Sequence, residues 1–203
     1  MTQIKICGIK RSEDVEYINE LRPDYCGFIV NFPRSHRSID IDNLESLTKD
    51  VNESIMRVGV FVNDDINTIS NLLNDDVIDI AQLHGNEDES YINELKTLTN
   101  KPIIKAFTIK SEDDVINAIK SSADYILLDK GQGSGEAFDW SLITAIDRPW
   151  FLAGGLSTDN LAEAIGRIKP YAVDLSSSVE TDKVKDKDKI SKVIDIVRRT
   201  EYV

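Results

Sequence analysis

A cysteine and an aspartate, far apart in the sequence, have the chemistry needed to move protons on a small molecule. Cys7 ends an apolar run that begins at Gln3, and Asp129 ends another that begins at Asp124. A thiol, whose ordinary pKa is about 8.5, acts as a base where its surroundings favour the thiolate, and a desolvated carboxyl group acts as an acid. An acid and a base on opposite sides of a ligand suit an isomerase. The alternatives are that Cys7 is an inert core residue and that Asp129 only caps the following loop.

Two segments rich in small residues have the composition of a phosphate-binding site. Most expected helix starts carry acids, such as Asp64 and Asp65, which the helix dipole favours. Residues 153–158 and 175–179 contain no acid and leave backbone N–H groups open to an outside anion. They follow the seventh and eighth apolar runs, where barrel enzymes often bind phosphate. The expected phosphate-binding residues are Gly154, Gly155, Ser176 and Ser177. The alternative is a tight glycine turn followed by serines that only cap helices.

The elements that must position these residues repeat along the chain. Eight short apolar runs begin at Gln3, Tyr25, Ile55, Val77, Pro102, Asp124, Pro149 and Tyr171. One strand, one helix and their turns fill each interval, and eight such units close a parallel (β/α)8 barrel. The runs are continuously apolar, as in strands buried on both faces. We therefore predict the α/β class and one compact TIM-barrel domain over residues 1–203, with short loops and with Cys7 and Asp129 at the same mouth.

Helices between the runs are indicated by apolar spacing and by capping residues. One stripe with the spacing of a helix that lies on a sheet comprises Leu161, Ala164, Ile165 and Ile168. A second comprises Ile190, Val193, Ile194 and Val197. The expected N-caps are Ser12, Ser111 and Ser157. These signals support the alternation of strands and helices.

Composition and charge limit the classes of partner. The 203 residues are 41% apolar, and 36 acidic against 24 basic residues give a formal charge of -12. No basic stretch offsets this charge, so we expect neither nucleic acid nor a membrane as a partner, and any anionic ligand must be held by local positive potential. Cys7 and Cys26 are interpreted as free thiols of a cytoplasmic protein, because no apolar run has the length of a signal peptide or a membrane span.

The motifs at the ends of the apolar runs resemble, in order, those of phosphoribosylanthranilate isomerases. The matching segments are Lys5-Ile6-Cys7-Gly8, Gly27-Phe28, Ser35-His36-Arg37-Ser38-Ile39, Val58-Gly59-Val60-Phe61-Val62-Asn63, Gln82-Leu83-His84-Gly85, Leu128-Asp129, Gly133-Ser134-Gly135, Phe138-Asp139-Trp140, Ala153-Gly154-Gly155-Leu156 with Asn160, and Val173-Asp174-Leu175-Ser176-Ser177 before Val179-Glu180. A single piece such as Gly154-Gly155 is a weak signal. The ordered series covers essentially the whole chain and is highly specific.

The resemblance implies an Amadori rearrangement in tryptophan biosynthesis, without cofactor or metal. N-(5′-phosphoribosyl)anthranilate becomes 1-(2-carboxyphenylamino)-1-deoxyribulose 5-phosphate. Carried onto this chain, the resemblance makes Asp129 the general acid that protonates the furanose ring oxygen and opens the ring to a Schiff base. Cys7 would be the general base that removes the proton from C2 of the sugar.

The resemblance also implies which residues bind the substrate. Arg37 matches the family arginine near the anthranilate end, where a guanidinium pairs with a carboxylate in fork geometry. The positions that line the pocket would be Gln82, His84 and Asp174, and the glycine and serine segments match the phosphate-binding segments. The alternatives are that Arg37 forms a surface salt bridge and that His84 is an ordinary histidine at a strand end.

Two departures from the family pattern and two alternative functions remain open at this point. His36 stands where many members have proline, and Ser178 stands where glycine is common, so a positive φ at Ser178 would cost free energy.

Another sugar-phosphate barrel enzyme, such as a ribulose-phosphate epimerase or an indole-glycerol-phosphate synthase, needs a metal site or a catalytic lysine. The two histidines, His36 and His84, are too few for a histidine-rich metal site. The other alternative is a barrel that binds a phosphorylated metabolite without catalysis. We expect a monomer or a homodimer.

Overall fold

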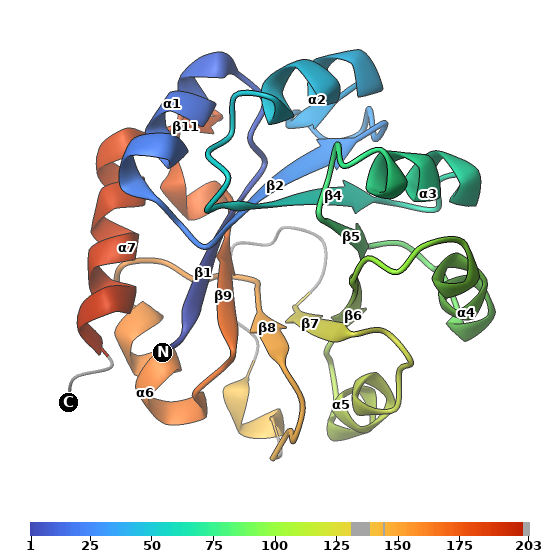
Figure 1. The fold of residues 1–203 in the computed structure, drawn as a ribbon. Helices are drawn as coiled ribbons and strands as arrows, with labels where there is room; N and C mark the ends of the chain where they lie inside the picture. The colour runs from blue at the N-terminus through green and yellow to red at the C-terminus, as the bar shows by residue number, and fades with distance from the viewer. Residues whose placement is uncertain (131–138, 144, 201–203) are drawn as a thin grey trace.

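Eight parallel strands close into a barrel, as the spacing of the apolar runs predicts (Figure 1). The computed structural model describes residues 1–130, 139–143 and 145–200. The barrel strands are β1 (Gln3–Cys7), β2 (Tyr25–Val30), β4 (Met56–Phe61), β5 (Ile80–Leu83), β6 (Ile103–Thr108), β7 (Tyr125–Asp129), β8 (Trp150–Leu152) and β9 (Ala172–Leu175). Because β1 pairs with both β2 and β9, the first and last strands meet and the sheet has no free edge.

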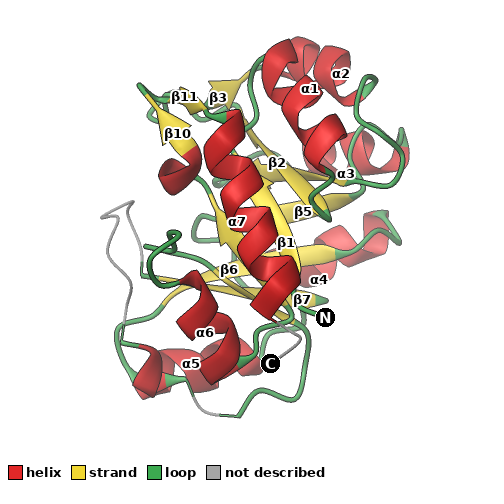
Figure 2. Ribbon diagram, turned by 90° about the vertical axis from the view of Figure 1, so that its left-hand side faces the viewer, coloured by secondary structure: helices red, strands yellow, loops and turns green. Residues whose placement is uncertain are grey.

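Helices surround the barrel and alternate with its strands (Figure 1). The described residues form α1 (Ser12–Leu21), α2 (Ile41–Thr48), α3 (Ile66–Asn74), α4 (Glu89–Leu98), α5 (Glu112–Ile119), α6 (Leu161–Ile168) and α7 (Lys187–Thr200). Figure 2 shows α7 lying across the outside of the barrel, where it packs against α1, α6 and β1. Three short strands add to the repeat. They are β3 (Ser38–Ile39), which pairs with β2, and the hairpin of β10 (Glu180–Thr181) and β11 (Val184–Lys185).

The interval between β7 and β8 departs from the regular repeat. The described part of this interval contains a 3₁₀-helix at Trp140–Leu142 where the repeat predicts an α-helix. Trp140 is buried, and the Arg148 guanidinium donates to the backbone carbonyls of Ile119, Ser121 and Ala123. These contacts fasten the segment to the end of α5. The family motif Gly133-Ser134-Gly135, with Phe138, lies outside the described residues.

Capping predictions are confirmed at one serine and wrong at two. Ser111 caps α5, because its hydroxyl oxygen accepts a hydrogen bond from the Asp114 backbone amide at 3.3 Å. Ser12 is instead the first residue of α1, whose N-cap is Arg11. Ser157 precedes a turn, and α6 begins only after Asn160. In these two turns other polar side chains accept the backbone amides: Asp14 accepts from the Arg11 amide, and Asn160 accepts from the Ser157 amide.

The core forms two layers, one between barrel and helices and one inside the barrel. Side chains that fill the barrel interior are Val58, Val60, Ile80, Ile104, Leu127 and Phe151. At the N-terminal ends of the strands, Tyr25 and Tyr125 pack edge-on against Phe151, with ring centroids 5.3 and 5.8 Å away. The barrel is therefore filled at that end, and open space remains at the C-terminal ends of the strands. No helix in the described ranges has both the length and the apolar character needed to cross a membrane.

Candidate active site

One cavity of about 1220 Å³ opens at the C-terminal ends of the barrel strands. It brings together every residue that the sequence analysis singles out for chemistry or binding. These are Cys7, Arg37, Gln82, His84, Asp129, Gly154, Gly155, Asp174, Ser176 and Ser177. They come from six different strands or the loops after them, so the closed barrel is what assembles the cavity.

Cys7 ends β1 with its side chain inside the barrel, whereas Cys26 on β2 faces the helices. Lys5 lies two residues earlier on the same face of β1, and its Nζ is 2.9 Å from Asp174 Oδ2. Burial raises the pKa of the Cys7 thiol, and the neighbouring Lys5 charge opposes this rise. The thiol is therefore the main form at neutral pH, and Lys5 supports the thiolate once it forms. Gly27 leaves room for the Cys7 and Lys5 side chains, because a Cβ there would lie 2.9 Å from Cys7 Sγ and 3.0 Å from Lys5 Nζ.

Asp129 ends β7, and its side chain is 18% exposed at the cavity. His84 Nε2 lies 3.6 Å from Asp129 Oδ2, just beyond hydrogen-bond distance. On its other side, His84 Nδ1 is 2.9 Å from the amide nitrogen of Gln82. The donor in this contact depends on the tautomer of the ring, and Nε2 is the ring nitrogen that faces Asp129. Gln82 thus contacts His84, and His84 lies beside the Asp129 carboxyl group.

Gly154 makes space for Asp129 from the neighbouring strand. Its φ of 83° lies in the left-handed region, and a Cβ there would be 2.5 Å from Asp129 Oδ1 and 2.9 Å from the Lys130 amide nitrogen. Both the backbone conformation and the close approach therefore require glycine.

Replacing Gly154 by alanine should lower turnover by up to about 10²-fold, because the new methyl group displaces the Asp129 carboxyl group. The positive φ should also lower the free energy of unfolding by about 1–2 kcal/mol. Steady-state kinetics and urea denaturation measure the two effects. Gly166→Ala in α6 is the matched control, because a Cβ there meets nothing within 4 Å. Wild-type turnover in Gly154→Ala would contradict the importance of this contact.

The expected phosphate-binding segments form two shaped turns beside Cys7 and Asp129. Gly155 has a φ of 65°, and its carbonyl accepts from Asn160 Nδ2 at 2.9 Å. The Ser176 hydroxyl donates to the Cys7 carbonyl at 3.0 Å, which links the ends of β9 and β1. Ser177 begins a 3₁₀-helix that ends at Val179. Ser178 does not have a positive φ. A serine at this position therefore carries no free-energy cost from a left-handed backbone.

Arg37 lies at the cavity with its guanidinium paired to Glu180. Arg37 Nε is 2.6 Å from Glu180 Oε1, and Nη2 is 2.8 Å from Oε2. The salt bridge that stood as the alternative for Arg37 is therefore present, but the Arg37 side chain is only 18% exposed and lines the cavity. Gly8 has a φ of 87°, and a Cβ there would be 2.4 Å from Arg37 Cδ. Burial alone would raise the pKa of Glu180, but hydrogen bonds from Arg37 and Lys185 lower it to about 2.

The family model for N-(5'phosphoribosyl)anthranilate (PRA) isomerase matches residues 4–196, which span every barrel strand except the first residue of β1. The chain belongs to this family. An N-(5'-phosphoribosyl)anthranilate isomerase of Endomicrobium trichonymphae is 47% identical over 203 residues, covering 98% of this chain and 99% of the relative. The Clostridium acetobutylicum isomerase is 39% identical over 208 residues, with coverage of 98% and 99%.

Solved structures of phosphoribosylanthranilate isomerases have the same fold. The Thermotoga maritima enzyme superposes with a TM-score of 0.87 at 33% identity, covering 98% of this chain and 99% of that one. Another solved isomerase, in complex with reduced 1-(o-carboxyphenylamino)-1-deoxyribulose 5-phosphate, has a TM-score of 0.85, with the same identity and coverage. The predicted barrel and the predicted family are both confirmed.

Buried charged residues complete this isomerase site, and the sequence analysis assigned no role to them. Lys105 Nζ is 2.8 Å from Glu87 Oε2, and Glu87 Oε1 accepts from the Asn63 amide at 2.6 Å. This pair ties the loops after β4 and β5 to strand β6. Glu87 is only 6% exposed, and Asp88, the next residue, caps α4. A charged residue inside an otherwise apolar run, as Lys105 is, was the signal that could have revealed the pair.

Proposed function

As a member of this family, the chain is an N-(5′-phosphoribosyl)anthranilate isomerase of tryptophan biosynthesis, and we propose that Asp129 and Cys7 move the protons of its reaction. The observation that carries the proposal is the single cavity, which holds a carboxyl group, a thiol, an arginine and two glycine or serine segments. Each of these groups has one part of the substrate to act on: the ring oxygen, C2, the carboxylate and the phosphate.

The reaction begins at the ring oxygen of the ribose. Asp129 donates a proton to this oxygen, the bond from C1 to the oxygen breaks, and the anthranilate nitrogen supplies the electron pair that forms the Schiff base. Asp129 is left as a carboxylate, with His84 Nε2 at 3.6 Å from its Oδ2. The contact between Gln82 and His84 supports this orientation of the ring.

Cys7 acts in the second step, at C2. Its thiolate removes the C2 proton, and the electrons of that bond form an enolamine while the nitrogen becomes neutral. Proton gain at C1 and loss of the hydroxyl proton at C2 then give the ketone, so no atom is gained or lost overall. Lys5 stabilises the thiolate that this step requires, since its electrostatic effect on Cys7 favours the charged form.

The two charged ends of the substrate set its direction in the cavity. We propose that the phosphate binds at Gly154, Gly155, Ser176 and Ser177, and that the anthranilate carboxylate binds near Arg37. Gln82, His84 and Asp174 then line the middle of the cavity. With the ends fixed, the ribose lies between Asp129 and Cys7, which come from strands β7 and β1, separated in the ring by β8 and β9.

Consumption of freshly generated phosphoribosylanthranilate by the purified protein, followed by its fluorescence, tests the reaction and the substrate together. We expect loss of the signal at a rate proportional to the protein concentration. A non-catalytic binding barrel would bind the compound without consuming it, and another sugar-phosphate enzyme would leave it unchanged. Either outcome would contradict the proposal. The cytoplasmic location and the monomeric or homodimeric state stay predictions, and size-exclusion chromatography with light scattering tests the second.

A further inference from the structure

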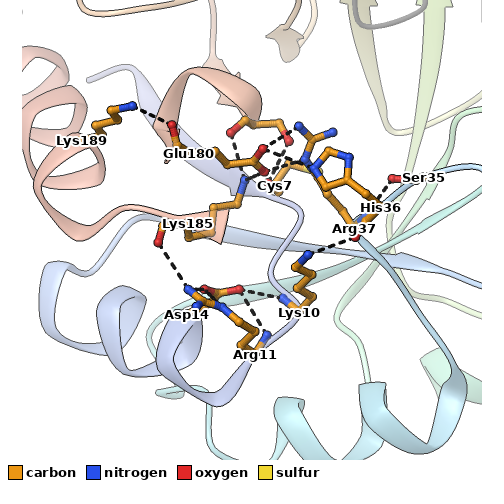
Figure 3. Close-up of polar contacts among 11 residues, drawn as sticks. Cys7, Lys10, Arg11, Asp14, Ser35, His36, Arg37, Glu180, Lys185 and Lys189 are labelled. Atoms are coloured by element: carbon orange, nitrogen blue, oxygen red, sulfur yellow. Dashed lines mark hydrogen bonds and ion pairs between the residues drawn. The ribbon is translucent and has the colours of Figure 1, made fainter. Parts of the chain in front are cut away.

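The Glu180 carboxylate contacts three cationic or potentially cationic side chains, of which Arg37 lines the cavity (Figure 3). Oε1 accepts from Arg37 Nε at 2.6 Å and from Lys185 Nζ at 2.8 Å. Oε2 accepts from Arg37 Nη2 at 2.8 Å and lies 3.5 Å from His36 Nε2. The Glu180 side chain is 7% exposed, so this is a built cluster rather than a chance surface contact.

The geometry of the Arg37 contact leaves part of the guanidinium free for another carboxylate. A guanidinium has five N–H groups and two edges on which it can make a fork, one through Nε and Nη2 and the other through Nη1 and Nη2. Glu180 occupies the first edge. Arg37 lines the cavity, so an anion that enters the cavity can approach this side chain.

The same carboxylate also reaches the backbone around Cys7. Lys185 Nζ, held by Glu180, donates to the Ser176 carbonyl at 2.9 Å. The Ser176 hydroxyl in turn donates to the Cys7 carbonyl at 3.0 Å. Glu180 thus joins Arg37, at one end of the expected substrate, to the segment beside the thiol. With one carboxylate between Arg37 and Lys185, the group keeps a net positive charge in a chain whose formal charge is -12.

We propose that Glu180 is a positioning residue that holds the Arg37 guanidinium with its free edge toward the cavity, ready for the substrate carboxylate. This inference rests on the proposed function, in which Arg37 binds that carboxylate. The opposite arrangement is competition, in which Glu180 occupies Arg37 and must be displaced before the substrate binds. The two arrangements predict opposite effects of removing the Glu180 charge.

Two ligands that differ only in the carboxylate separate a positioning role from a structural one. The first is reduced 1-(o-carboxyphenylamino)-1-deoxyribulose 5-phosphate, and the second is its phenylamino counterpart without the carboxylate. Glu180→Gln should weaken binding of the first ligand by about 10-fold or more, because a charge-assisted contact becomes misaligned, and should change binding of the second by no more than about 2-fold. Isothermal titration calorimetry measures both affinities, and it does not depend on turnover.

Arg37→Gln and the double variant test whether Glu180 acts through Arg37. Arg37→Gln should also weaken binding of the carboxylated ligand but not of its counterpart. Adding Glu180→Gln to Arg37→Gln should cause little further loss of affinity. Asp79→Asn is the matched control, because Asp79 holds Arg57 by the same edge at 2.9 and 2.8 Å, at the opposite ends of the strands. This control should keep wild-type affinity for both ligands. If Glu180→Gln does not fold, Glu180→Asp, which cannot span the same contacts, replaces it, with the same expected selectivity.

Each contrary result overturns the inference in a distinct way. Tighter binding of the carboxylated ligand by Glu180→Gln would show competition. Equal losses for both ligands would show a structural role. Wild-type affinity in Glu180→Gln, together with weak binding by Arg37→Gln, would contradict the positioning role of Glu180. It would leave the carboxylate-binding role of Arg37 in place. Wild-type affinity in both variants would contradict the carboxylate-binding role of Arg37 as well.

Discussion

Asp129→Asn should lower kcat by about 10²–10⁴-fold, because the asparagine amide is far too weak an acid to transfer a proton to the ring oxygen. The amide is nearly the same size as the carboxyl group, so it should fit against Gly154, whose missing Cβ leaves the space. Binding of phosphorylated ligands should be largely kept, since an amide of nearly the same size fills the same space beside Gly154 and leaves that turn in place. Stopped-flow or steady-state fluorescence of phosphoribosylanthranilate measures the loss in kcat.

A second aspartate near the same strand provides the control for this prediction. Asp124 immediately precedes β7 and lies at the opposite end of the strand, where it contacts Lys96 Nζ at 2.9 Å and the Ile103 amide at 2.9 Å. Asp124→Asn should lower stability without lowering kcat. If Asp129→Asn kept wild-type kcat, Asp129 would not be the acid, whatever the effect of the control.

Cys7→Ser should also lower kcat by about 10²–10⁴-fold, because a serine hydroxyl is a far weaker base than a thiolate. The pH dependence follows from the same assignment. The base is the deprotonated thiol, and burial raises the pKa of Cys7, so kcat/KM of the wild-type enzyme should rise as the pH increases from neutral to alkaline values. This limb should be absent from the residual activity of Cys7→Ser. A pH series of kcat/KM for both proteins measures it.

Cys26→Ser distinguishes the base from a general need for a thiol. Cys26 is buried on β2 next to β1, but its side chain faces the helices and does not line the cavity. Its replacement should reduce stability and leave the alkaline limb unchanged. Equal losses of kcat in the two serine variants would contradict a specific role of Cys7.

The strands and the cavity could be predicted because each depends on local patterns. Continuous apolar runs mark strands buried on both faces, and a parallel barrel places the residue at the C-terminal end of each strand at one mouth. Cys7 and Asp129 were predictable for this reason. The described part of the segment between β7 and β8 was not, because it contains a 3₁₀-helix at Trp140–Leu142 and Arg148 contacts another part of the chain.

The charge pairs of the site could not be predicted from spacing, because their members are far apart in sequence. Lys5 and Asp174 meet across β1 and β9, and Arg37 meets Glu180 only when the barrel closes. Which acid pairs with which base depends on the register of the strands and on the hairpin before α7. A lysine inside an apolar run indicates a buried charge, but it does not identify the partner.

The most direct test of the account is a crystal structure of this chain with reduced 1-(o-carboxyphenylamino)-1-deoxyribulose 5-phosphate bound. We expect Cys7 Sγ and the Asp129 carboxylate within hydrogen-bond reach of the sugar on opposite faces, the phosphate at the glycine and serine segments, and the carboxylate at the free edge of Arg37. A ligand whose sugar contacts neither side chain, or contacts both on one face, would contradict the assignment of acid and base.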